Sequence, residues 1–510
     1  MSEMAVPAEE KVGAGGAGKP VETRGKLSLG VQVFQNTAAQ LAGRVIGIFL
    51  SAGTSILLAR YLGKEKLGEY GAIYAYLALY AFFATFCLEQ IIAREISVRR
   101  HQAAEIFHSA RVISFVFAIG GTLIATLAAP LFGYSGTIRW LIAVAALDML
   151  ILSPVKFTGI IFQVEMKLWY SVATGLVRQA LWLAAVALLA MRSAAFYEVI
   201  VARTLVGTVE AVLIVWSVRR TGLIRGEWRF IKKEALVLLR AGFPLVLTMM
   251  ASVIFLRIDQ VMLHKISGDR VLGPYVIAVQ LTELFSALPV ALMVSMFPTL
   301  AQNANDRELF QRYLREAYRF LLFVVFAACA LVGPLALPAI ELFYGKEYEA
   351  TARLLVVLVW SEVPIFFTAV LNNALVAKNL QKHILVPAVI GAVTNILLNL
   401  WAIPRYGALG ASWATVASYA IGTMYFLCVR PVRPLVVPGI RAGFWPLMVA
   451  LGVGYSLSVV AVHFWWKLVL GAILYVAGAR LSGAIRKSDF EKLRTLMGGA
   501  FPWLRDDRLG

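Results

Sequence analysis

Long apolar runs, each about the length of a membrane-spanning helix, follow one another along most of the chain. A helix needs about 20 mostly apolar residues to cross the hydrocarbon layer of a bilayer. By this measure the pattern predicts about fourteen spans, at residues 31–58, 68–92, 110–132, 138–162, 168–191, 196–217, 240–264, 273–299, 317–340, 353–376, 384–403, 408–429, 442–462 and 464–483. The expected fold class is an all-α polytopic membrane protein.

The composition excludes the alternative of a soluble protein. Of the 510 residues, 60% are hydrophobic and only 15% are charged, and the mean hydropathy is +0.77. Soluble domains are about 45–50% apolar and about 25% charged. Because so few charged side chains cannot cover the surface of a soluble protein of this length, the solvent of this chain is lipid.

The charge is strongly basic, with 48 Lys and Arg residues against 29 Asp and Glu residues and a formal net charge of +19. Such a surplus is found in nucleic-acid-binding proteins, but it also marks the cytoplasmic loops of membrane proteins. With the N-terminus inside, the inner segments collect most basic residues, including those around Arg99, Lys232, Arg312 and Arg433. The distribution of charge therefore predicts that the chain lies in the cytoplasmic membrane with both termini in the cytoplasm. It predicts no nucleic-acid partner.

An internal repeat organises the chain. Residues 57–70 align without gaps on residues 262–275, with five identities. The matching pairs are Leu58 and Leu263, Gly63 and Gly268, Leu67 and Leu272, Gly68 and Gly273, and Tyr70 and Tyr275. Leucines and glycines at helix corners also recur by chance, but these fall at equivalent places in the helix order. Six predicted spans separate the copies, so the two halves run in the same direction, with the substrate site expected between them.

The repeat and the spans together predict two parallel six-helix bundles around a central cleft, plus two C-terminal helices. The predicted parts are a disordered cytoplasmic tail at 1–30, the first bundle at 31–217, a basic cytoplasmic linker at 218–239, the second bundle at 240–430, the additional helix pair at 442–483, and a basic cytoplasmic tail at 484–510. All predicted loops are short. This weighs against a membrane transferase, which needs a sizeable loop or domain for a water-soluble acceptor.

No motif for catalysis, metal binding or cofactor binding is recognisable. Cys87, Cys329 and Cys428 lie far apart, without the spacing of a metal site. The chain also lacks nucleotide-binding and hydrolase signatures. We therefore expect no enzyme activity, no catalytic residue, no cofactor and no metal. Transport would then be driven by a gradient of H+ or Na+, or by removal of the product.

Polar residues inside the predicted spans are the candidates for function, because an ionisable group at the bilayer centre costs about 2.5–3.5 kcal/mol unless it faces a partner or water. Asn36, Gln40 and Arg44 follow one another at helical spacing and form one polar stripe on the first span. The stripe is expected to form a wall of a hydrated cleft; the alternative is a helix-helix contact held by amide hydrogen bonds.

Further intramembrane residues are candidates for the cleft or for ion coupling: Asp148, Lys156, Arg178, Arg257, Asp259, Glu283, Glu362, Asn395 and Asn399. Arg203 and Glu210, seven residues apart, share a helical face and could form a structural ion pair. Arg257 and Asp259 differ by two positions, point to different sides of the seventh span, and are not expected to neutralise each other.

Several motifs resemble one family. Asn36, Ala59-Arg60-Tyr61-Leu62-Gly63, Leu67-Gly68-Glu69-Tyr70, Arg257-Ile258-Asp259-Gln260, Leu272-Gly273-Pro274-Tyr275 and Ile403-Pro404-Arg405-Tyr406-Gly407-Ala408-Leu409-Gly410-Ala411 resemble the polysaccharide transporter branch of the multidrug/oligosaccharidyl-lipid/polysaccharide (MOP) exporter superfamily. The resemblance covers about residues 30–430.

The resemblance implies a flippase. Members of the branch move polyprenyl-diphosphate-linked oligosaccharides across the cytoplasmic membrane by alternating access, for O-antigen, capsule or exopolysaccharide assembly. It implies a cationic cleft lining, for which Arg44 and Arg257 are predicted because Arg engages a diphosphate through paired donors. The implied partners are the lipid-linked oligosaccharide, membrane lipids, and the polymerase and glycosyltransferases of the pathway. The alternatives are an ion-coupled multidrug exporter of the same superfamily and a lipid II flippase.

Overall fold

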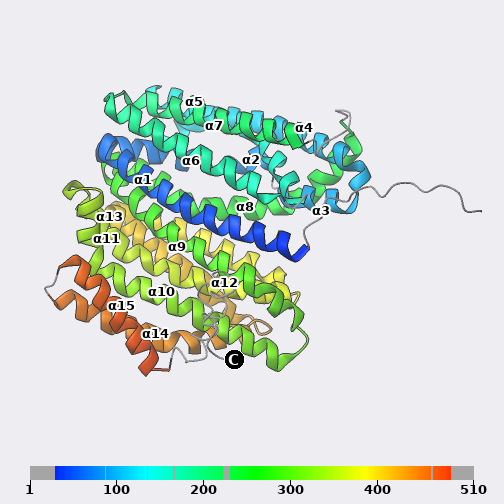
Figure 1. Cartoon of the computed structure of the whole chain (residues 1–510). Coiled ribbons are helices and arrows are strands. Elements are labelled where there is room, and N and C mark those ends of the chain that lie inside the picture. Colours follow the sequence, from blue (N-terminus) through cyan, green and yellow to red (C-terminus); the bar gives the residue numbers. More distant parts are fainter. Residues whose placement is uncertain are drawn as a thin grey trace, which may run out of the picture.

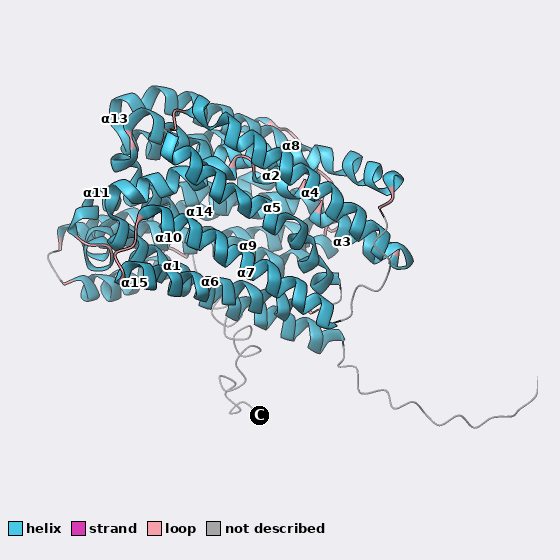
Figure 2. Ribbon diagram, turned by 90° about the horizontal axis from the view of Figure 1, so that it is seen from above, coloured by secondary structure: helices cyan, strands magenta, loops and turns pink. Residues whose placement is uncertain are grey.

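The computed structural model describes residues 29–86, 88–134, 136–164, 167–221, 230–460 and 463–483. Cys87, nearly all of the predicted N-terminal tail, the middle of the predicted linker and the predicted C-terminal tail lie outside the described residues. Every secondary-structure element of the described part is a helix, as Figure 2 shows. The predicted all-α fold is confirmed.

Twelve helical segments of the described chain are long and apolar enough to cross a membrane. The number differs from the predicted fourteen because one continuous helix contains the predicted spans 384–403 and 408–429 almost entirely, and another contains the first span and the start of the second. The helices are α1 (Leu29–Ala78) and α13 (Leu385–Cys428), which turn without a loop at Gly63 and Gly407. Both glycines have positive φ, at 69° and 55°, a region that residues with a Cβ rarely adopt.

The second predicted span, 68–92, is wrong as a single helix. The helix α1 ends at Ala78, and two short helices follow, α2 (Ala81–Thr85) and α3 (Glu89–Val98). The chain breaks between them because Phe86 adopts a left-handed conformation, with φ 48°. Hydrophobicity alone does not reveal this break, since the broken segment remains apolar up to Leu88.

The first bundle contains α1 to α3 and four long helices, which occupy the upper part of Figure 1. The long helices are α4 (Ala103–Ala128), α5 (Gly136–Val164), α6 (Leu168–Met191) and α7 (Phe196–Thr221). Within the bundle α4 packs on α5, α5 on α7 and α1 on α6. Large apolar side chains cover the outward surfaces, as expected for helices that face lipid.

The second bundle lies below the first in Figure 1. Its helices are α8 (Lys232–Ser267), α9 (Asp269–Gln302), α10 (Arg307–Phe343), α11 (Glu349–Leu358), α12 (Glu362–Ala377) and α13. The last pair, α14 (Arg433–Val459) and α15 (Phe464–Leu481), packs on α10 at the edge of this bundle. Short 3-10 turns connect several of these helices.

The two copies of the repeat have the same backbone geometry and contact each other reciprocally. Gly63 has φ 69° and ψ 175°, and the matching Gly268 has φ 80° and ψ 170°. A Cβ added at Gly68 would lie 2.0 Å from the backbone oxygen of Asp269, and a Cβ added at Gly273 would lie 2.1 Å from that of Lys64. The repeat relates the two contacts to each other, because Gly68 matches Gly273 and Lys64 matches Asp269. A pseudo-two-fold axis therefore passes between α1 and α9.

Candidate functional site

A cavity of about 330 Å³ lies between the two bundles. Its lining comes from α1, α6 and α7 of the first bundle, from α9 of the second, and from the residue after α10. The lining residues are Ser51, Ala52, Thr54, Ser55, Leu58, Leu67, Tyr70, Arg178, Gln179, Trp182, Arg203, Gln280, Leu281, Glu283, Leu284 and Tyr344. The predicted central cleft therefore has a counterpart in the structure, lined by charged, amide, hydroxyl and aromatic side chains.

Hydrogen bonds join the two bundles beside this cavity. The Ser55 hydroxyl donates to Gln280 Oε1 at 2.8 Å, and the Tyr344 hydroxyl donates to Ser55 Oγ at 3.3 Å. Nearer the Gly63 kink, the Tyr348 hydroxyl donates to the backbone oxygen of Ala59 at 2.8 Å. Each of these bonds connects α1 to the second bundle, so separating the bundles at this level would break them.

Two ion pairs neutralise charges in or next to the cavity. Arg178 on α6 pairs with Glu210 on α7, with Nε 3.2 Å from Oε2. Arg257 on α8 pairs with Glu283 on α9, with Nη1 3.0 Å from Oε1 and Nη2 donating to Oε2 at 3.3 Å. Both pairs are partly exposed to the interior space, which is consistent with a hydrated site.

Arg203 has different partners. Its guanidinium donates to the Tyr70 hydroxyl, and its Cζ lies 3.7 Å from the centroid of the Tyr74 ring and 5.9 Å from that of Trp182. The ion pair considered for Arg203 and Glu210 is not formed, because Glu210 faces Arg178 on the neighbouring helix. Helical spacing identifies residues on one face, but it does not say which neighbouring helix supplies a closer partner.

The polar stripe of the first span does not line this cavity. Gln40 and Arg44 are exposed on the N-terminal half of α1, while the cavity is reached only from Ser51 onward. The side chains of Asn36 and Lys156 lie outside the described residues. The predicted role of the stripe in substrate binding stays a prediction.

Asp259 is buried on α8 and held by two hydrogen bonds. The Tyr275 hydroxyl donates to Oδ2 at 2.5 Å, and the Gln260 backbone N–H donates to Oδ1 at 2.7 Å. Arg257, two residues before, pairs with Glu283 instead. The prediction that Arg257 and Asp259 do not neutralise each other is confirmed by these separate partners.

The remaining polar candidates lie inside the bundles. Glu362 is 1% exposed and accepts hydrogen bonds from the Ser286 hydroxyl at 2.8 and 2.9 Å. Asn395 and Asn399 are both fully buried on α13, where Asn399 Nδ2 donates to Asn395 Oδ1 at 3.0 Å. Asp148 Oδ1 lies against Gly207 on α7, 2.9 Å from the position of an added Cβ. None of these four residues lines the cavity.

Several residues of the cavity were not predicted from the sequence. Gln179 and Gln280 carry amides inside apolar helices, and the cost of burying an unsatisfied polar group would have identified them. Trp182, Tyr70 and Tyr344 give no such signal, because aromatic residues at helical spacing are also ordinary packing residues. Only the tertiary contacts separate the two roles.

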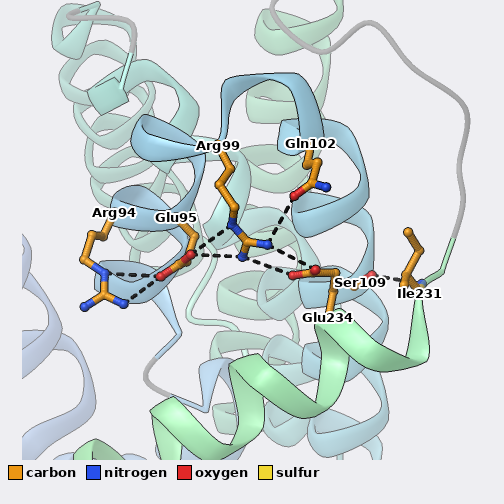
Figure 3. A network of polar contacts seen from close by, with 7 residues as sticks. All are labelled: Arg94, Glu95, Arg99, Gln102, Ser109, Ile231 and Glu234. Carbon is orange, nitrogen blue, oxygen red and sulfur yellow. Dashed lines mark hydrogen bonds and ion pairs between the residues drawn. The ribbon is translucent and has the colours of Figure 1, made fainter. Parts of the chain in front are cut away.

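A second polar contact joins the bundles far from the Gly63 end. Figure 3 shows Arg99, which follows α3, reaching Glu234 in the first turn of α8. Arg99 Nη2 lies 3.1 Å from Glu234 Oε2 and 2.9 Å from Glu95 Oε2. Since α8 has 36 residues, Glu234 and Gly268 lie roughly 50 Å apart along the helix axis.

The network around Arg99, here called the latch (Glu95, Arg99 and Glu234), is charge-assisted. Arg94 Nη2 donates to Glu95 Oε1 at 2.6 Å, and this bond together with Arg99 lowers the pKa of Glu95 below its usual value, against a smaller effect of burial that raises it. Close by, the Ile231 backbone N–H donates to Ser109 Oγ at 3.1 Å (Figure 3). The start of α8 is therefore fastened to the first bundle.

The fold and the enclosed polar cavity define a class of protein. Two helical bundles related by a pseudo-two-fold axis, with a polar site between them and apolar surfaces outside, form a multi-pass membrane transporter. The contacts at the Gly63 end and at the latch lie on opposite sides of the site, as alternating access requires.

Comparison with known proteins identifies the family. Residues 57–353, more than half of the chain, match the model of the family described as "Polysaccharide biosynthesis protein". The chain belongs to this family. The resemblance seen in the sequence is confirmed.

Two curated relatives match part of the chain. The chain is 28% identical over 190 residues to "Probable flippase AglR" of Haloferax volcanii, covering 36% of this chain and 40% of the relative. It is 26% identical over 196 residues to "Lipid II flippase MurJ" of Bacillus subtilis, covering 38% and 32%. The matched parts thus span less than half of the length of either relative. Both names describe flippases rather than enzymes.

A solved structure shares the fold over most of the chain. The lipid II flippase MurJ in an inward closed conformation superposes with a TM-score of 0.68 and 17% identity, covering 88% of this chain and 98% of the other. At this identity the likeness concerns the fold alone. It supports the two-bundle architecture and the placement of α14 and α15 beside it.

Proposed function

We propose that the protein is a flippase for polyprenyl-diphosphate-linked oligosaccharide repeat units, which it moves across the cytoplasmic membrane for surface polysaccharide assembly. The observation that carries the proposal is the chemistry of the inter-bundle cavity. A guanidinium group in the lining suits the diphosphate, and the amides of Gln179 and Gln280 suit sugar hydroxyls. The aromatic rings of Trp182 and Tyr344 offer apolar faces for sugar rings.

Two sets of contacts between the bundles, one at the Gly63 end and one at the latch, support alternating access. Opening at the Gly63 end would separate the reciprocal glycine contacts and the bond from Tyr348 to Ala59. Opening at the other end would separate Arg99 from Glu234. The positive-inside pattern of the sequence supports a latch on the cytoplasmic side, where we expect the substrate to be made, with both termini in the cytoplasm.

Several buried residues are proposed for ion coupling. Asp259 and Glu362 are buried carboxylates of the second bundle, and Asn395 and Asn399 lie on α13, which packs on α8. Asn395 Nδ2 and Asn399 Oδ1 have no hydrogen-bond partner among the described residues. Buried polar groups of this kind are expected to serve H+ or Na+ movement. Arg257 acts on the cavity through Glu283, and Arg44 is proposed to meet the substrate at the entrance.

A lipid II flippase is the second candidate. The partial sequence match to MurJ favours it, and lipid II is also a lipid-linked sugar. A multidrug exporter for cations is less favoured, because an arginine-lined cavity repels cations. The family description favours polysaccharide biosynthesis, with the pathway's glycosyltransferases and polymerase as partners.

Deletion of the gene tests the proposal. Lipid-linked repeat units are expected to accumulate on the inner face of the membrane, and surface polysaccharide is expected to disappear while the cells continue to divide. The matched control is the deletion strain carrying the wild-type gene on a plasmid. Normal surface polysaccharide in the deletion strain would refute the proposal. Arrested peptidoglycan synthesis with accumulated lipid II would support the second candidate instead.

A further inference from the structure

The charges that line the cavity do not cancel. The lining contains three charged residues, Arg178, Arg203 and Glu283. Arg178 is neutralised by Glu210, and Glu283 is neutralised by Arg257. No ion pair of the described residues includes Arg203. The net positive charge of the lining is therefore that of Arg203.

Arg203 is held in place without being neutralised. The Tyr70 hydroxyl accepts one hydrogen bond, and the Tyr74 ring lies under the guanidinium at 3.7 Å from Cζ. Aromatic faces stabilise a cation electrostatically and leave its charge intact. A guanidinium has five N–H donors, and the hydrogen bond to the Tyr70 hydroxyl uses one of them. An arginine fixed by aromatic rings in this way is pre-organised for an anion.

An independent observation also indicates a ligand beside Arg203. Gln179 lines the cavity, and its Oε1 is buried without a hydrogen-bond partner among the described residues. The Tyr74 hydroxyl is likewise buried without such a partner. Buried polar atoms normally have partners. An anionic ligand that also carries hydroxyl groups would satisfy Gln179 Oε1 together with Arg203, since both residues line the cavity.

The matching position of the second half has the opposite charge. Tyr70 and Tyr275 are equivalent residues of the repeat. Tyr70 accepts a hydrogen bond from the cation Arg203, whereas Tyr275 donates one to the carboxylate of Asp259. The repeat thus presents a cation at one side of the pseudo-two-fold axis and an anion at the other, so only the first bundle offers an anion site at this position.

Another carboxylate lies near this site. Asp148 rests against Gly207, one turn along α7 from Arg203. It forms no ion pair with Arg203, whose contacts are with Tyr70 and the aromatic rings. Asp148 therefore limits the space in which an anion is favoured. It does not neutralise the Arg203 guanidinium.

We infer that Arg203 is the residue of the cavity that binds the anionic group of the substrate, the diphosphate of a lipid-linked sugar. The inference rests on the proposed function for the substrate class, and it replaces Arg44 and Arg257 as the principal diphosphate ligands. Arg203 holds the anion directly, and Tyr70 and Tyr74 are positioning residues for Arg203.

Equilibrium binding tests the inference. The full-length purified protein is titrated with radiolabelled farnesyl diphosphate, with farnesol as the uncharged competitor. R203Q is expected to weaken farnesyl diphosphate binding about 10- to 100-fold at low salt, the loss typical of one or two charge-assisted hydrogen bonds. Farnesol competition is expected to stay unchanged. R203K, which keeps the charge but not the planar donor arrangement, should retain part of the affinity.

Two controls separate the role of Arg203 from general effects of charge. The double variant R178Q/E210Q removes a neutral pair from the same cavity and should change the affinity less than threefold. R192Q removes an exposed cation at the end of α6 and should leave the affinity unchanged. Unchanged melting temperatures of all variants exclude misfolding, and if R203Q does not fold, R203K gives the comparison.

Three results would overturn the inference: wild-type affinity in R203Q, an equal loss in R178Q/E210Q, or equal wild-type affinities for farnesyl diphosphate and farnesol. The proposed function is judged separately by the deletion strain. If the wild-type gene is needed for surface polysaccharide and the R203Q gene fully replaces it, the flippase assignment stands and the role of Arg203 falls.

Discussion

The reciprocal glycine contact at the pseudo-two-fold axis allows a quantitative test of how the bundles close. In Gly68→Ala the new methyl group would lie 2.0 Å from the backbone oxygen of Asp269, and in Gly273→Ala 2.1 Å from that of Lys64. Ordinary contacts of a Cβ lie at 3.4 Å or more. The distance between the bundles at this contact would have to increase by about 1.4 Å, from 2.0 to 3.4 Å, because backbone atoms inside helices cannot give way alone.

The expected cost follows from overpacking. Inserting a methyl group into a packed interface destabilises by about 1–3 kcal/mol. The control is Gly120→Ala on α4, where an added Cβ meets nothing within 4 Å. That control should be neutral or stabilising by up to about 1 kcal/mol, since alanine favours the helix. Thermal unfolding of the purified variants in one detergent measures the differences.

The double variant G68A/G273A adds a sharper test. One separation of the bundles relieves both clashes, so the double variant should be less destabilised than the sum of the single variants, by about 0.5 kcal/mol or more. Full additivity would show that the two contacts yield independently. Single variants as stable as Gly120→Ala would refute the close approach itself.

Three further predictions concern the latch and the contacts between the bundles. Arg99→Ala removes the bonds to Glu95 and Glu234 and should increase hydrogen exchange in the first turns of α8, at a cost of about 1 kcal/mol because the pairs are partly exposed. The pKa of Glu95 is lowered in the folded protein, so the Glu95 carboxylate stabilises the fold fully above about pH 4.3, and this stabilisation is lost as the pH falls through the lowered pKa. The difference in melting temperature between the wild type and Glu95→Gln should therefore shrink as the pH falls. A difference that persists in strong acid would contradict this. Tyr348→Phe leaves the buried oxygen of Ala59 without its 2.8 Å bond and should cost about 1–2 kcal/mol, whereas unchanged unfolding would show that another donor replaces the hydroxyl.

Much of the architecture could be predicted from local patterns. Lipid requires apolar runs of a fixed length, and this located most of the helices, although α4, α8, α10 and α14 begin seven to ten residues before the predicted spans. The repeat was also visible, because glycines with positive φ cannot be replaced freely by other residues. Gly63 and Gly268 therefore mark equivalent corners in both the sequence and the structure.

The continuity of helices was less accessible. Hydropathy does not distinguish a turn through Gly407 from a loop, and it did not reveal the break at Phe86. Both features depend on the backbone conformation of one residue. The helices that pack around Gly407 and Phe86 set the backbone conformation of these residues. The residue type alone is compatible with more than one conformation.

The sequence by itself determined the lipid environment, the helical class, the two parallel halves and the family, because each of these rests on composition, period or local motifs. The tertiary structure decided which charges meet. Helical spacing suggested Glu210 as the partner of Arg203, but Glu210 pairs with Arg178. Arg203 instead packs against aromatic rings at the cavity wall. Ion pairs between helices depend on helix rotation and separation of a few ångströms, and no pattern along one helix contains that information.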